Sequence, residues 1–267
     1  MTSPTYTLAD DLAVALTLAA EADLIAIDRY RAQDLDVQLK PDRTQVTDAD
    51  TRVERMIRDH LDSARPGDAI LGEEFGGGDP HAPGRQWVID PIDGTSNFVR
   101  GVPIWGSLIA LVVDGVPQVG VVSAPALERR WWAATGHGAW MQVHGEAARG
   151  IRVSGVGELA DATLSYNNLR GWDREGRSDQ LLGLSRAVGR TRAFGDLWSY
   201  MLLAEGAIDI AGEFDLKPWD IAALVPVIRE AGGIATTAEG DDRLDTGSLI
   251  ATNGALHAGV LERLSVR

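Results

Sequence analysis

Four acidic residues stand beside apolar segments, where their carboxylates could bind divalent cations. Asp90 and Asp93 follow an apolar run in the segment WVIDPIDGTSNF. Glu73 lies near the end of the short apolar segment AILGEE, and Asp220 begins a long apolar one. Mg²⁺ prefers a few carboxylates, water molecules and the oxygens of a substrate phosphate. The four acids therefore predict a magnesium site that binds the phosphate group of a substrate.

The residues after the first of these acids favour an anion-binding turn. Pro91 cannot continue a hydrogen-bonded ladder, so we expect the chain to turn there. The Asp-Gly-Thr sequence that follows is typical of a turn into a helix, where the amides of Gly94 and Thr95 would be free to bind an anion. Asp220 by itself has a simpler interpretation, as an acid at the positive end of a helix.

The order of these motifs along the chain resembles that of the inositol monophosphatase family. The motifs are GEE, then WVIDPIDGTSNF, then WD before an apolar segment that ends in EAGG. The resemblance covers most of the chain. It implies a sandwich of alternating helix and sheet layers (αβαβα, of the fructose-1,6-bisphosphatase type) and a homodimer. It also implies Mg²⁺ as the cofactor, with two or three ions per active site.

The same resemblance assigns roles to individual residues. The implied metal ligands form two sets: Glu73, Asp90 and the Ile92 carbonyl for one ion, and Asp90, Asp93 and Asp220 for the second. Thr95 and Glu73 resemble the pair that orients and deprotonates the attacking water, and Asp50 resembles the acid that hydrogen-bonds to that threonine. The phosphate would be bound by Asp93 and by the amides of Gly94 and Thr95.

The implied chemistry is physically consistent with clustered acids. Hydrolysis of a phosphate monoester needs a hydroxide near neutral pH and stabilisation of charge on the phosphate and the leaving oxygen, which paired metal ions supply. Four or five crowded carboxylates would repel one another without cations. We therefore expect metal binding to stabilise the fold.

A longer segment narrows the range of substrates that we expect. Residues 97–139 resemble the histidinol-phosphatases of the inositol-monophosphatase type. Asp196 stands where a small neutral residue is usual, and Glu213 matches a position that contacts the organic part of the substrate. With Asp220, these carboxylates would favour the amine and imidazole of histidinol phosphate. The alternatives are inositol 1-phosphate or a broad range of sugar and nucleotide monoesters, and for Asp196 the role of a helix N-cap.

Composition excludes other classes of function. The 267-residue chain has a net charge of −14, which disfavours nucleic acid as a partner and requires local positive charge at any phosphate site. Without cysteine, zinc sites and nucleophiles based on thiols are excluded. Residues 1–30 predict an amphipathic helix rather than a signal peptide. Polar breaks interrupt the longest apolar stretch, so we expect no membrane span and a cytoplasmic protein.

The elements that position the acids indicate a mixed fold. Thr47 or Asp48 is expected to cap a helix that buries Val53, Ile57 and Leu61. Short strands, including a hairpin with an Asp-Gly turn, then predict an antiparallel sheet as far as about residue 150. These features predict an N-terminal α+β subdomain, 1–150, with most metal ligands, and an α/β subdomain, 151–267, that completes the site.

Other motifs carry less weight. The sequence DADT, residues 48–51, matches the nucleophile box of haloacid-dehalogenase phosphatases but lacks the apolar strand that should precede it. Lys40 is interpreted as a surface lysine, with reach toward the phosphate as the alternative. The histidines are scattered without metal-ligand spacing: His60, His81, His137, His144 and His257.

A non-catalytic relative that only binds a ligand or partner would be expected to have lost at least one metal-ligand position, and none is lost.

Overall fold

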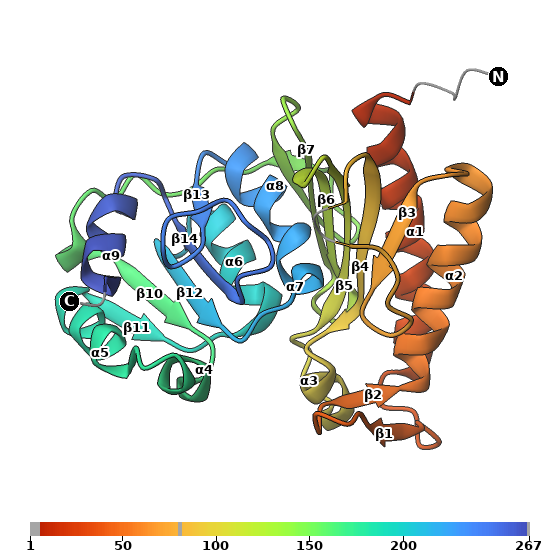
Figure 1. Ribbon diagram of the computed structural model, residues 1–267, viewed down its shortest axis with the longest axis horizontal. Helices are drawn as coiled ribbons and strands as arrows, with labels where there is room; N and C mark the ends of the chain where they lie inside the picture. Colours follow the sequence, from red (N-terminus) through yellow and green to blue (C-terminus); the bar gives the residue numbers. More distant parts are fainter. Residues whose placement is uncertain (1–5, 80–81, 266–267) are drawn as a thin grey trace.

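Helices and sheets alternate in five layers in the computed structural model, which describes residues 6–79 and 82–265 (Figure 1). His81 and the first five residues of the predicted N-terminal helix lie outside this part. Two long helices cover the outer face of the first sheet: α1 (Leu8–Arg29) and α2 (Asp48–Ala64). The predicted alternation of helix and sheet layers is confirmed.

Two separate sheets form the second and fourth layers. The first sheet is mostly antiparallel and has seven strands: β3 (Ala69–Gly72), β4 (Arg85–Asp93), β5 (Gly106–Val113), β6 (Val116–Ala124), β7 (Arg129–Ala134), β8 (Ala139–Val143) and β9 (Arg149–Gly150). The second sheet is mixed, in the spatial order β11 (Arg190–Arg192), β10 (Thr163–Tyr166), β12 (Ile210–Phe214), β14 (Ser248–Thr252) and β13 (Ile234–Thr236).

Helices fill the space between the sheets and cover the outer face of the second one (Figure 1). The central layer holds α6 (Asp196–Ala204), α7 (Pro218–Ala222) and α8 (Leu224–Glu230). The outer layer holds α4 (Leu169–Arg174), α5 (Ser178–Ala187) and α9 (His257–Leu264). The remaining elements are the hairpin β1 (Val37–Leu39) and β2 (Gln45–Thr47), α3 (Thr95–Arg100), and the 3₁₀ helices η1 (Pro125–Leu127) and η2 (Leu159–Asp161).

Small residues bring α1 close to the sheet. Its fully buried face is rich in alanine: Ala15, Leu18, Ala19, Ala22 and Ala26. The leucines Leu8, Leu12 and Leu16 are only half-buried at the margin of this face. Because alanine side chains are short, the helix axis can approach the strands, and the larger side chains of the sheet fill the core.

An irregularity in β4 turns two acids to one side. The expected turn at Pro91 is wrong, because the strand continues through this residue to Asp93. Asp90 pairs with Leu108 and Asp93 with Gly106, so the register shifts by one residue between them. Residues three apart in a regular strand face opposite sides, and one extra residue cancels that alternation. The bulge therefore lets both aspartates face the same cleft.

The predicted helix that contains Asp220 is divided in two. It forms α7 and α8, with Ala223 between them. Pro226 has no N–H to donate to the carbonyl four residues earlier, which explains the break one turn before it. Helix α8 ends with Ala231 as its C-cap, one residue before the predicted Gly232, which follows it in the left-handed conformation with φ +88°. No helix of the described residues combines the length and apolar character needed to cross a bilayer.

Candidate metal-dependent active site

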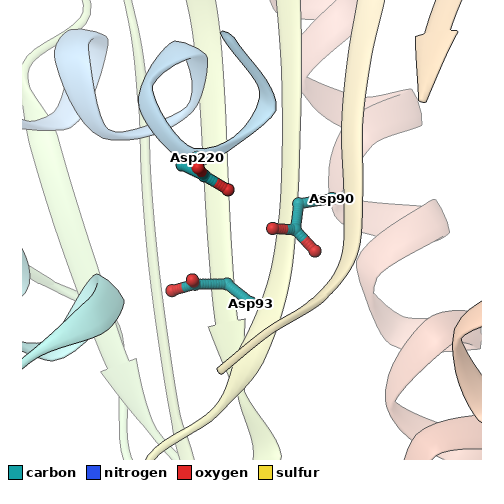
Figure 2. A group of neighbouring side chains, drawn as sticks. All are labelled: Asp90, Asp93 and Asp220. Atoms are coloured by element: carbon teal, nitrogen blue, oxygen red, sulfur yellow. The ribbon is translucent and has the colours of Figure 1, made fainter. Parts of the chain in front are cut away.

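Three aspartates from β4 and α7 lie close together around one space (Figure 2). Asp90, Asp93 and Asp220 each offer one carboxylate oxygen, and these oxygens lie within 4.8 Å of one another. Asp90 is 2% exposed, and its Oδ1 has no hydrogen-bond partner among the described residues. Because a buried polar atom normally has a partner, this oxygen marks a place that a divalent cation would complete.

Burial and mutual repulsion raise the pKa values of these aspartates. Burial is the main cause for Asp90, and the carboxylates of Glu73 and Asp93 add to it. Burial likewise raises the pKa of Asp93, with a contribution from Asp196. It raises the pKa of Asp220 to about 7. A site built from oxygen ligands that resist ionisation when no cation is present fits a hard divalent ion, whose charge would restore the ionised forms.

Glu73 lines the same cleft, which has a volume of about 920 Å³. Lys40, from the loop between β1 and β2, donates through Nζ to Glu73 Oε1 at 2.6 Å and to Glu74 Oε1 at 2.8 Å. Its side chain is 19% exposed, so the interpretation of Lys40 as a surface lysine is wrong. Burial opposes its charge, but the two glutamates raise its pKa. Lys40 thus brings positive charge to the acidic cleft.

Asp50, in the first turn of α2, is fully buried and contacts Thr95, which lines the cleft. Its Oδ2 accepts the N–H of the N-cap Thr47 at 2.8 Å, and its Oδ1 lies 3.4 Å from Thr95 Oγ1. The Thr95 hydroxyl also donates to the Ile92 carbonyl at 3.0 Å. Burial raises the pKa of Asp50 to about 6. The structure therefore brings these predicted site residues together, while their catalytic roles stay predictions.

The predicted turn and helix after Asp93 are present. Gly94 is the N-cap of α3 and has φ +81°, which favours glycine. A Cβ atom there would lie 3.0 Å from the Ile104 carbonyl oxygen. Gly94 and Thr95 both line the cleft that holds the aspartates. Their position is consistent with the predicted phosphate-binding role.

A smaller cavity of about 220 Å³ adjoins the cleft and shares Asp93 and Asp220 with it. Asp196 and Glu213 line this cavity, as does Asn167. The Asn167 side-chain amide donates to Glu213 Oε1 and lies 3.5 Å from Asp196 Oδ1. Burial raises the pKa values of both carboxyl groups, and the Asn167 amide opposes the shift in each. The cavity thus presents two acids beside the cluster of aspartates.

The start of α6 differs from the expectation. Its N-cap is Gly195, so the alternative interpretation of Asp196 as the N-cap is wrong. Asp196 has φ +47°, and its Oδ2 accepts a hydrogen bond from Asn97 Nδ2 at 2.9 Å. The Leu197 N–H donates to Asp93 Oδ2 at 2.7 Å. The start of α6 therefore contributes Asp196 to the cavity and, through the Leu197 N–H, holds Asp93 in place.

Two asparagines of the site were missed in the sequence. Asn97 is separated by 99 residues from Asp196, and Asn167 by 46 residues from Glu213. No local pattern joins residues so far apart. The only available signal for Asn97 is its place within the DGTSN segment, and Asn167 has none.

Comparisons with known proteins agree with this geometry. Residues 8–266 match the model of the inositol monophosphatase family. The chain is 55% identical over 256 residues to a Mycobacterium tuberculosis protein named histidinol-phosphatase, with coverage of 96% of this chain and 98% of that protein. A Streptomyces coelicolor protein of the same name is 48% identical over 264 residues, covering 97% and 98%. The solved structure of the extragenic suppressor protein SuhB from Bartonella henselae aligns with a TM-score of 0.83 and 29% identity, covering 94% and 97%.

Proposed function

Because the chain belongs to the inositol monophosphatase family, we propose that it is a phosphomonoesterase that hydrolyses L-histidinol phosphate to L-histidinol and phosphate. This reaction is a step of histidine biosynthesis. The observation that carries the substrate assignment is a pair of carboxylates, the half-buried Asp196 and the buried Glu213, in the cavity beside the acidic cleft. Similarity over nearly the full chain to two proteins named histidinol-phosphatase supports it.

The family is metal dependent, and we assign Mg²⁺ to the acidic cleft. Two or three ions would be held by the predicted ligands: Glu73, Asp90 and the Ile92 carbonyl for one ion, and Asp90, Asp93 and Asp220 for the second. When bound, such ions lower the pKa of water and stabilise negative charge on the phosphate and the leaving oxygen. The crowded carboxylates and the unpartnered Asp90 oxygen support this assignment.

The chain's own residues would orient the reaction. Thr95 and Glu73 hold the attacking water, and Glu73 accepts its proton as the new bond from oxygen to phosphorus forms. Asp50 fixes the Thr95 hydroxyl, which lies 3.4 Å from its Oδ1. The amides of Gly94 and Thr95 bind phosphate oxygens. The bond from phosphorus to the substrate oxygen breaks in line with the attack, and the leaving oxygen takes a proton from water to give the hydroxyl group of histidinol.

The adjoining cavity would receive the organic part of the substrate. Histidinol carries an amine and an imidazole that can be positive, whereas inositol carries only hydroxyl groups. Asp196 and Glu213 would favour the cation, with Asp220 at the junction of cavity and cleft. Asn167 donates to Glu213 and lies close to Asp196, so it would limit the repulsion between the two acids.

Phosphate release from a panel of monoesters tests the proposal. The panel holds histidinol phosphate, inositol 1-phosphate, a sugar phosphate and 3'-phosphoadenosine 5'-phosphate, each with Mg²⁺ and then with a chelator. We expect the highest kcat/KM for histidinol phosphate and loss of all activity with the chelator. Comparable rates on every ester would support the broad-specificity alternative, and a preference for inositol 1-phosphate would overturn the substrate assignment.

Two substitutions test how the substrate is recognised. Asp196→Ala and Glu213→Ala should each lower kcat/KM for histidinol phosphate by about 10-fold or more, which is the scale of one lost charged hydrogen bond. Hydrolysis of inositol 1-phosphate by the same variants should change less. An unchanged preference in both variants would contradict the assigned role of these carboxylates.

A homodimer is proposed from family membership. Light scattering coupled to size-exclusion chromatography would give about twice the chain mass of 28.6 kDa. A single-chain mass at enzyme concentrations that retain full activity would contradict this proposal.

A further inference from the structure

A fully buried glutamate on α2 has no part in the proposed chemistry. Glu54 is 0% exposed and lies one helical turn after Asp50. It does not line the acidic cleft. Removing a carboxylate from water is costly unless hydrogen bonds and an opposite charge compensate it. The groups that hydrogen-bond to the Glu54 carboxylate therefore indicate its role.

The Glu54 carboxylate holds the backbone of the loop that carries Glu73. Its Oε2 accepts the N–H of Glu74 at 2.7 Å, and its Oε1 accepts the N–H of Phe75 at 3.2 Å. Arg58, one turn further along α2, pairs with Glu54 Oε1 at 2.8 Å and also donates to the Gly76 carbonyl. Helix α2 thus binds three consecutive residues that directly follow the proposed metal ligand.

The loop is shaped to admit this carboxylate. A Cβ atom on Gly72 would lie 2.0 Å from Glu54 Oε1, so a residue with a side chain could not occupy this position without displacing it. Gly72 and Gly76 exchange two backbone hydrogen bonds of 3.1 Å, which closes the loop around the Glu54 oxygens. On the other side, the Glu73 N–H donates to the carbonyl of Ile89, the residue before Asp90, at 3.2 Å. The Glu73 backbone is therefore fixed from both directions.

Contacts of the Phe75 ring strengthen the attachment. The guanidinium groups of Arg55 and Arg58 lie 5.6 Å and 5.9 Å from the centre of the ring. Phe75 is 45% exposed, so these cation–π contacts, rather than burial in a core, hold it against α2. Side chain and backbone of the loop are therefore both attached to the same helix.

We propose that Glu54 is a positioning residue that fixes the Glu73 carboxylate beside Asp90 for metal binding. Through Asp50 the same helix contacts Thr95, the other residue assigned to the attacking water. Two positions four residues apart on one rigid helix thus set the distance between groups that belong to different loops. Small displacements of such groups weaken metal binding and catalysis strongly. The inference rests on the proposed role of Glu73.

The variant Glu54→Gln tests this inference, because it keeps the size of the side chain but loses the charge and one acceptor. We expect its Mg²⁺ affinity, measured by calorimetric titration of the metal alone, to fall by about 10- to 100-fold. We expect kcat to fall by a similar factor at fixed Mg²⁺, with KM changed by less than about 3-fold, and excess Mg²⁺ to restore part of kcat.

Asp11→Asn is the matched control for lost stability. Asp11 is also 0% exposed and pairs with Arg65 and Arg85. It lines neither the cleft nor the adjoining cavity. This variant should lose stability to a comparable extent in urea unfolding, while its Mg²⁺ affinity and kcat stay within about 2-fold of the unchanged protein. If both variants lose metal affinity equally, Glu54 is only structural and the inference is wrong.

A second variant covers the case in which Glu54→Gln does not fold. Arg58→Gln removes the ion pair and the contact to Gly76 from a side chain that is 23% exposed. It should lower Mg²⁺ affinity in the same direction by a smaller factor, and unchanged affinity would contradict the inference. If the unchanged protein hydrolyses no monoester in the presence of Mg²⁺, the proposed function fails instead, so the two failures are distinguishable.

Discussion

Asp90 is the residue on which the proposed metal site depends most. It is a predicted ligand of both ions, it is almost fully buried, and one of its oxygens lacks a hydrogen-bond partner among the described residues. Its motif was recognisable in the sequence, because two acids, a proline and a glycine follow an apolar strand. The bulge that turns Asp90 and Asp93 to the same side was not recognisable, since Pro91 was expected to end the strand rather than lie within it.

Asp90→Asn should lower catalytic activity while it raises the stability of the metal-free protein. The loss of a shared ligand is expected to lower kcat by at least about 100-fold. The metal-free protein should become more stable in urea unfolding, because an acid that is disfavoured by burial and by repulsion from neighbouring carboxylates has been replaced by a neutral amide. Asp62→Asn, an exposed change on α2, should alter neither quantity. Activity above a tenth of the original, or a less stable metal-free protein, would contradict the assignment.

The stability of the metal-free protein should depend on pH with a definite sign. Burial raises the pKa of Asp220 from 3.8 to about 7, so between these values the folded state binds a proton that the unfolded state has released. The contribution of Asp220 to stability should therefore be full below about pH 4 and should be lost as pH rises to about 7. Thermal unfolding across this range would measure the slope, which Asp220→Asn and saturating Mg²⁺ should each reduce. A slope that neither change affects would contradict this account.

At the scale of elements, local signals predicted well those features that neighbouring residues determine. Of the two expected N-caps of α2, Thr47 is the one present, and the buried face of α2 and the Asp114–Gly115 turn are present as well. Features that depend on distant partners were not predictable. The hairpin β1–β2 is short and polar, and only its contact through Lys40 with Glu73, 33 residues away, shows why it matters to the site.

Thr47→Ala tests whether the cap of α2 also serves the site. Loss of the cap should cost about 1 kcal/mol in the free energy of unfolding. It should also lower kcat, because Asp50 loses the Thr47 hydroxyl that holds it near Thr95. Thr7→Ala is the matched control, since Thr7 forms an equivalent capping box with Asp10 on α1, away from the cleft. Equal loss of kcat in the two variants would contradict a specific role for the α2 cap.

At the scale of the whole molecule, the acidic chain places basic groups around its cleft. The net charge is −14, yet five cationic residues line the cleft: Lys40, Arg43, Arg100, Arg174 and Lys217. The local positive charge that the composition requires at a phosphate site is therefore present, in addition to any bound cations. The proposed division at residue 150 is consistent with one sheet on each side of it. The cleft lies between the two parts, since Asp90 belongs to the first and Asp220 to the second.

The salt dependence of the reaction tests whether the substrate is attracted by the basic groups of the cleft or repelled by the overall negative charge of the protein. If the basic groups of the cleft dominate, kcat/KM should fall several-fold as ionic strength rises from about 10 to 150 mM, because screening weakens their attraction for the phosphate. Arg100→Gln should reduce this dependence and leave kcat almost unchanged. A rise of kcat/KM with salt would show instead that the overall negative charge repels the substrate.

Anomalous diffraction from crystals grown with Mn²⁺ and inorganic phosphate would show where divalent ions bind. We expect anomalous peaks bound by Glu73, Asp90, Asp93 and Asp220, with Asp90 shared between two of them and the phosphate beside Gly94 and Thr95. Crystals that bind Mn²⁺ elsewhere and leave these four carboxylates without an ion would contradict the proposed metal site.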